Sequence, residues 1–188
     1  MKKKVLFIYL PIILGVLIYI LFRSKSLFYF QIFKLLNLDI YIIEVRKFVF
    51  LYRKLIPNWV IYSLPDGLWI FSFGSALLFN FKNFNKKLII FCIAFLTTIL
   101  FEYVQFYFGG HGSLFGTFDI ADLVCFFSAF FLCIILNSLL YLRDKSIKSV
   151  EMSSNTSESF FQIFKSQISI LIIYFILSIL PTLLKVKK

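Results

Sequence analysis

The sequence has too few charged residues for a soluble domain. Of its 188 residues, 15% are charged and 61% are hydrophobic, whereas soluble domains are about one-quarter charged and about half apolar. A soluble core of this size could not bury that much apolar surface. The scarcity of charge therefore excludes a soluble globular domain and indicates a membrane protein.

Cysteine is also scarce. The chain has three cysteines, Cys92, Cys125 and Cys133, and all fall inside apolar segments, where a free thiol behaves as a small buried hydrophobic group. An odd number of cysteines without metal-type spacing indicates neither a disulfide framework nor a zinc site.

The beginning of the sequence lacks a small-residue cleavage site. Three lysines follow Met1, and an apolar run over residues 5–22 comes next. The basic start is typical of a signal peptide, but the run is too long and no cleavage site follows it. We therefore expect an uncleaved first helix.

Nearly uncharged apolar stretches of spanning length recur along the chain. About 18 residues suffice to cross a hydrocarbon layer of about 30 Å, because a helix rises about 1.5 Å per residue. The sequence therefore predicts one all-α domain over residues 1–188, a polytopic transmembrane helical bundle with about five spans. The expected spans are about 5–22, 59–80, 88–108, 118–142 and 167–184.

Two connecting segments differ from the spans. Residues 26–57 are apolar but carry charged side chains at a density that is costly at membrane depth. We expect an amphipathic segment in the membrane interface, with the alternative that residues 27–43 dip into or cross the bilayer. Residues 143–159 are polar and rich in serine, which predicts a solvated linker.

The formal net charge of +11 comes from lysines and arginines between or just outside the apolar segments. Anionic lipid headgroups are therefore the expected partners, and nucleic acid is not, because no soluble element carries a basic face. With five spans, basic residues divide equally between the two sides, but the loop after the third span has none, so we place the N-terminus inside. A protein partner or a homo-oligomer is also compatible with the sequence.

Acidic residues are few, and four of them fall in or at the ends of expected spans. Burying a carboxylate at membrane depth costs about 2.5–3.5 kcal/mol on insertion scales, so such a group usually faces a bundle interior. Because successive spans run in opposite directions, the start of the second, the end of the third and the start of the fourth share one membrane face. We expect all four carboxylates in one leaflet: Asp66, Glu102, Asp119 and Asp122.

Two further polar residues accompany these acids. Gln105 shares a helix face with Glu102, and His111 lies in the glycine-containing loop that follows. No lysine or arginine occurs in residues 88–142 to neutralise the acids, so they must be protonated, hydrogen-bonded or bound to a cation. The candidate polar site comprises Asp66, Glu102, Gln105, His111, Asp119 and Asp122.

Simpler interpretations exist for most of these residues. Asp119 and Asp122 would also stabilise a helix start through the helix dipole. Asp66 follows Pro65 and would suit the first turn of a helix that begins there. His111 would be an exposed loop residue. Glu102 is harder to explain in this way, because apolar residues surround it in the sequence.

Two short motifs resemble the VanZ-like family of small bacterial membrane proteins. They are Phe-Glu-Tyr-Val-Gln at 101–105 and Gly-Thr-Phe-Asp-Ile-Ala-Asp at 116–122. The family carries Glu-x-x-Gln at the end of one helix and Arg-x-x-Asp-x-x-Asp at the start of the next. The resemblance covers residues 88–135, and residues 63–69 are similar to a motif of a related subgroup.

The matched positions are Glu102, Gln105, Asp119 and Asp122. The loop has no arginine, and Phe126 and Ala129 stand where the family has Asn and Gly. The resemblance implies a multi-pass protein of the bacterial cytoplasmic membrane with a role in the cell envelope and in teicoplanin resistance. It implies no settled biochemical activity, no catalytic residue and no cofactor.

Other functions remain open at this stage. A metal-dependent intramembrane enzyme could hold Mg²⁺ or Ca²⁺ against a lipid phosphate through Glu102, Asp119 and Asp122, although no basic side chain to bind the phosphate is evident. A small transporter coupled to protons or cations would also use acids inside a bundle. The third alternative is a structural subunit of a larger assembly.

Overall fold

The computed structural model describes residues 5–23, 28–79, 83–110 and 117–148. Every regular element in these residues is a helix, which confirms the all-α prediction. The expected fifth span at 167–184, most of the linker at 143–159, and His111 lie outside the described residues.

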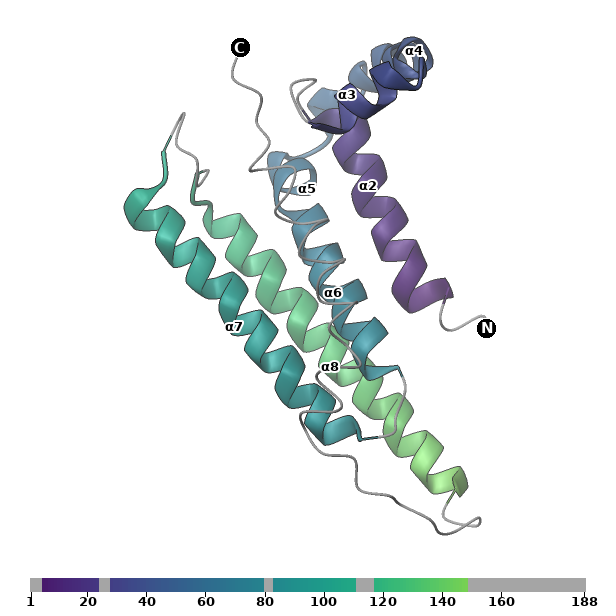
Figure 1. Cartoon of the computed structure of the whole chain (residues 1–188), viewed down its shortest axis with the longest axis vertical. Coiled ribbons are helices and arrows are strands. Elements are labelled where there is room, and N and C mark those ends of the chain that lie inside the picture. The colour runs from purple at the N-terminus through teal and green to yellow at the C-terminus, as the bar shows by residue number, and fades with distance from the viewer. Residues whose placement is uncertain (1–4, 24–27, 80–82, 111–116, 149–188) are drawn as a thin grey trace.

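Four long helical segments lie side by side (Figure 1). A π-helical turn, η1 (Val5–Tyr9), continues into α2 (Leu10–Phe22), and the other three are α6 (Leu64–Leu78), α7 (Phe84–Phe108) and α8 (Ile120–Lys148). α2 and α7 run in one direction, and α6 and α8 run in the opposite one. α6 is the central helix, because it packs against α2, α7 and α8.

Two of the described helices are long and apolar enough to cross a membrane. They are Phe84–Phe108 and the Ile120–Arg143 part of α8, which correspond to the expected third and fourth spans. The first expected span is a shorter apolar helix, Leu6–Phe22, and so is the helical core of the second, Leu64–Leu78. The described residues thus contain two helices of spanning length, where the sequence predicted four.

The second expected span is shorter because it is divided at Ser63. α5 (Asn58–Tyr62) ends where the Ser63 N–H donates to the Trp59 carbonyl at 2.9 Å. Pro65 occupies the first turn of α6, where its missing N–H is tolerated, but it would break a continuous helix. Asp66 consequently lies in the first turn of α6, as the simpler interpretation of this residue predicted.

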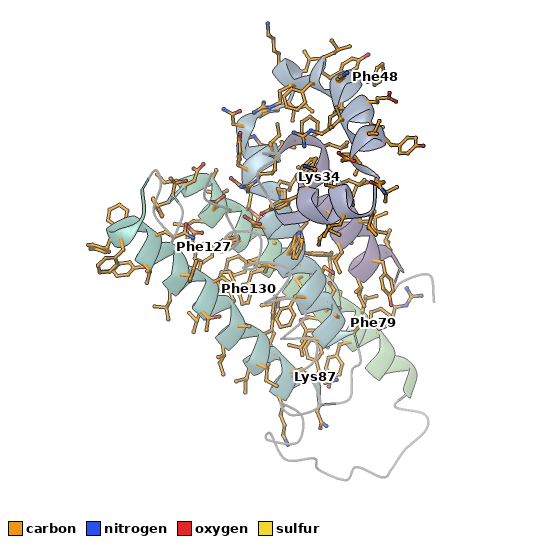
Figure 2. The ribbon with its side chains drawn as sticks, turned by 45° about the horizontal axis from the view of Figure 1, so that its top comes forward. Lys34, Phe48, Phe79, Lys87, Phe127 and Phe130 are labelled. Atoms are coloured by element: carbon orange, nitrogen blue, oxygen red, sulfur yellow. The ribbon has the colours of Figure 1, made fainter. Side chains whose placement is uncertain are left out.

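Short helices lie at one end of the bundle, beside the end of α2 (Figure 1). They are α3 (Phe28–Leu35), α4 (Asp39–Phe50) and the 3₁₀ turn η2 (Arg53–Leu55). Figure 2 shows Lys34 and Phe48 at this end, and Lys87 at the opposite end. We refer to α3 and α4 together as the platform.

The platform is divided into two helices. Asn37 ends the first helix in the left-handed conformation, with φ 56°, which Asn tolerates better than most residues. The Leu38 N–H then closes the turn by donating to the Phe33 carbonyl at 2.9 Å. The eight residues of α3 extend only about 12 Å, so residues 27–43 do not form one continuous helix. The alternative that this segment dips into or crosses the bilayer stays a prediction.

Aromatic rings from three helices form the core. Phe130 of α8 stacks on Phe95 of α7 with ring centroids 4.0 Å apart, and the centroid of the Phe91 ring lies 5.0 Å from that of Phe130. Figure 2 shows Phe127 and Phe130 near α7. Gly74 of α6 lets the helices approach, because a Cβ there would lie 2.6 Å from Cys133 Sγ. Packing of this kind, rather than hydrophobic collapse, holds helices together in lipid.

A polar contact joins α6 and α8 inside this core. Asn137 is 1% exposed, and its side-chain N–H group lies 2.9 Å from the Cys133 carbonyl, to which it donates. The same nitrogen lies 3.5 Å from the Ser75 hydroxyl of α6. Hydrogen bonds of this kind between apolar helices stabilise their register.

The substitution Gly74→Val should destabilise the bundle, because the added carbons would overlap Phe91 and Cys133. Overpacking of a dense core typically costs about 1–3 kcal/mol. Thermal unfolding of the purified chain in detergent would measure the loss. Ala76→Val, at a half-buried position on the same helix, is the control; equal midpoints for the two variants would contradict this account of the packing.

Candidate functional site: a polar cluster at one end of the bundle

The structure places the four acidic candidates at one end of the bundle. Asp66 opens α6, Glu102 lies in the penultimate turn of α7, and Asp119 and Asp122 stand at the start of α8. These helix ends, together with the end of α2, lie toward the platform (Figure 1). We refer to Asp66, Glu102 and Asp122 as the acidic cluster.

Glu102 is the most buried member of the acidic cluster. Its side chain is 6% exposed, and its Oε2 atom has no hydrogen-bond partner among the described residues. Its carboxyl group lies close enough to Asp66, Asp119 and Asp122 to interact with them electrostatically. Three acids from three helices thus share one region, where burial makes uncompensated negative charge costly.

Asp66 has a hydrogen-bond partner on α2. The Tyr19 hydroxyl donates to Asp66 Oδ1 at 2.7 Å, a typical length for an O–H···O hydrogen bond. Tyr19 is itself 6% exposed, so α2 contributes a buried polar group to the cluster.

Arg23, just after the end of α2, supplies positive charge beside the acidic cluster. It interacts electrostatically with both Asp66 and Asp122. Its Nη2 atom donates to the Tyr62 carbonyl at 2.8 Å, and its guanidinium lies 4.6 Å from the centroid of the Tyr19 ring. Its Nε atom is buried without a hydrogen-bond partner among the described residues.

Arg23 was not among the residues predicted from the sequence, because residues 88–142, which carry three of the four acids, contain no lysine or arginine. The alternation of helix direction nevertheless predicts the position of Arg23. The end of the first helix must lie at the same face as the start of the second, by the same alternation of direction that located the four acids. The expectation that no basic side chain accompanies the acids is therefore wrong.

Asp122 faces the helix break in α5–α6. The Ser63 hydroxyl lies near its carboxylate, but the pair does not meet hydrogen-bond geometry. Ser63 is 0% exposed, and its Oγ atom has no hydrogen-bond partner among the described residues. The break thus brings a buried, unsatisfied hydroxyl to the edge of the acidic cluster.

The remaining candidates have more peripheral positions. Asp119 is exposed, and its Oδ1 accepts the Ala121 N–H at 2.9 Å, so it stabilises the start of α8 in the manner of an N-cap. Gln105 is half-buried, and its backbone carbonyl accepts the Gly109 N–H at 2.8 Å.

The described acids do not form a metal-binding group. Magnesium and calcium require several oxygen atoms at about 2.0–2.6 Å around one point. Within the described ranges, no three His, Cys, Asp or Glu side chains are placed to hold a metal ion. Glu102, Asp119 and Asp122 are near enough to interact through their charges but do not converge on one point.

A second arginine connects the platform to this end of α2. Arg46 of α4 is 5% exposed, and it donates to the carbonyls of Ile20 and, at 2.7 Å, Arg23. Its guanidinium also lies 4.8 Å from the centroid of the Phe30 ring. A cation that satisfies the last carbonyls of a helix also interacts favourably with its dipole. Arg46 therefore fixes the end of α2 and the backbone of Arg23.

Exposed aromatic side chains occupy the last two turns of α7, near Glu102 in the sequence. Tyr103, Phe106 and Tyr107 follow Glu102 on α7 and are each 60% exposed. Phe106 packs edge to face on Phe118, with centroids 5.2 Å apart. Tyrosine and other aromatic rings at helix ends are typical of the level of lipid headgroups.

No family model, curated protein or solved structure matches the chain. The resemblance to the VanZ-like family therefore depends on the motif residues alone.

The substitution Tyr19→Phe should destabilise the protein, because it removes the donor to Asp66 and leaves a half-buried carboxylate without that partner. Hydrogen bonds to charged groups contribute about 1.5–3 kcal/mol. Thermal unfolding in detergent would measure the change. Tyr9→Phe, at the end of η1 where the side chain is 55% exposed, is the matched control. An equally small effect of both substitutions on thermal unfolding would contradict a role for the Tyr19 hydroxyl.

The substitution Arg46→Met should detach the platform from α2, because it keeps much of the apolar contact but leaves the carbonyls of Ile20 and Arg23 without this donor. Each such group costs about 1–3 kcal/mol. We expect faster trypsin cleavage within α3 and α4 of the purified protein. Lys47→Met, at an exposed neighbouring position, should leave the cleavage rate unchanged except at its own site; similar rates in the two variants would refute this role of Arg46.

Proposed function

We propose that this chain is a multi-pass protein of the bacterial cytoplasmic membrane, with about five spans, that acts in the cell envelope through the acidic cluster. The two spanning-length helices and the exposed apolar surface of α7 and α8 support a membrane location. The five-span arrangement takes α2, the α5–α6 pair and residues 167–184 as further crossings. The platform would then lie in the interface, where its exposed apolar and basic side chains suit lipid.

One observation carries this proposal: three acids from three helices lie near enough to interact electrostatically at one end of an otherwise apolar bundle, and Arg23 interacts with two of them. Ionisable residues at such depth are expensive and usually functional. A bundle that needed only structural stability would be better served by apolar residues at these positions. We therefore assign function to this end of the molecule.

The family resemblance supports an envelope role of the VanZ-like kind. Two of its four matched residues, Glu102 and Asp122, belong to the acidic cluster, and Asp119 interacts with both of them. Arg23 also stands beside the acids, although the motif arginine is missing from the loop. We propose that it takes over the charge of that arginine from another helix.

Arg23 also favours a second candidate, an enzyme that acts on a lipid phosphate. The guanidinium group suits phosphate oxygens. It supplies the basic side chain for phosphate binding that was not evident from the sequence. Release of phosphate from a lipid phosphate by the purified protein, lost in chelator, would support this candidate. Release of phosphate that persists in chelator would rule out a metal-dependent enzyme.

The substitutions Glu102→Gln and Asp122→Asn should abolish the envelope function, because each removes a charge and preserves side-chain volume. We expect the wild-type chain, produced in a teicoplanin-sensitive bacterium, to raise the teicoplanin concentration that inhibits growth, and both variants to lose that effect at equal membrane abundance. Glu44→Gln makes the same chemical change at an exposed position on α4 and is the control. Protection by the variants equal to that of wild type would sink the proposal.

A further inference from the structure

We propose that the acidic cluster binds the primary ammonium group of a phospholipid headgroup of the phosphoethanolamine class. This inference rests on the proposed function, since it requires that this end of the bundle lie at headgroup depth. It names the ligand that the cluster would hold there.

The oxygen atoms of the cluster need more hydrogen-bond donors than the described residues supply. Arg23 interacts electrostatically with Asp66 and Asp122, and part of its hydrogen-bonding capacity is already used by the Tyr62 carbonyl. Buried carboxylates need charged or hydrogen-bonding partners. The three acids therefore have capacity for one more positively charged group.

Four buried atoms in this region lack partners among the described residues: Arg23 Nε and three oxygen atoms, Glu102 Oε2, Asp122 Oδ1 and Ser63 Oγ. The side chains of Glu102 and Ser63 are 6% and 0% exposed. Buried polar groups in folded proteins are rarely left unsatisfied. Both side chains border Asp122, so a donor bound there would satisfy atoms from three helical segments.

The arrangement suits an ammonium group better than a metal ion. Among the described residues no three acidic, histidine or cysteine side chains are placed around one metal position. An ammonium group has three donors, each of which reaches an oxygen about 2.7–2.9 Å away. It can therefore bridge carboxylates that are too widely separated to coordinate a metal ion together.

The surroundings favour a lipid as the source of the ammonium group. Tyr103, Phe106 and Tyr107 are exposed beside Glu102, where aromatic rings typically meet headgroups. Arg23 interacts electrostatically with Asp66 and Asp122, so its guanidinium would attract a phosphate attached to the bound ammonium. A zwitterionic headgroup matches both signs of charge in this region.

Binding to the purified full-length chain in detergent tests the inference, with native mass spectrometry and thermal stability as readouts. The probes are lysophosphatidylethanolamine, lysophosphatidylcholine and lysophosphatidylglycerol. We expect the ethanolamine lipid to bind at least about tenfold more tightly than the choline lipid, because methylation removes the charge-assisted donors. Glu102→Gln should reduce binding of the ethanolamine lipid by a similar factor, whereas Glu44→Gln should not.

Several results would overturn the inference. They are equal affinity for the ethanolamine and choline lipids, preference for the glycerol lipid, displacement of the bound lipid by Mg²⁺ alone, and unchanged binding by a folded Glu102→Gln variant. If that variant does not fold, the comparison of headgroups on the wild-type chain decides. Selectivity for the ethanolamine headgroup without protection against teicoplanin would support this inference and overturn the proposed function. Protection against teicoplanin without headgroup selectivity would support the proposed function and overturn this inference.

Discussion

The close contact between α6 and α8 is the constraint on which the rest of the structure depends. At Gly67 a Cβ would lie 3.0 Å from the Cys125 carbonyl oxygen, so any larger side chain would separate the two helices. Gly67 directly follows Asp66, and Cys125 lies one turn after Asp122. The same contact that packs the helices therefore sets the spacing of two acids. Stability and the geometry of the site are coupled at this position.

The N-terminal part of the chain completes the site through two arginines with different tasks. Arg23 lies beside the acids, whereas Arg46 holds the backbone of Arg23 from the platform. A change in the position of α4 would therefore reach Arg23 directly, through one hydrogen bond to its carbonyl. The platform is thus part of the same polar end of the molecule, although it lies far from α7 in the sequence.

Much of this end of the molecule follows from simple rules applied to the sequence. Apolar helices that alternate in direction bring Asp66, Glu102 and Asp122 to one end, and the burial of Glu102 follows from its apolar neighbours. The break at Ser63 was harder to predict, because Pro65 is equally compatible with the first turn of a helix and with a kink inside one. The division of residues 27–43 depended on a single residue, Asn37, whose left-handed conformation is only a preference.

The sequence by itself determined the all-α class, the apolar character of the chain and the end at which the acids lie, because these depend on composition, period and direction. The tertiary structure alone decided which groups become partners: Tyr19 with Asp66, Arg23 with the acidic cluster, and Arg46 with the end of α2. These pairs are 20 or more residues apart, and each depends on the rotation and depth of its helices. Close packing around Gly67 and Gly74 sets that rotation and depth, and no local pattern in the sequence encodes it.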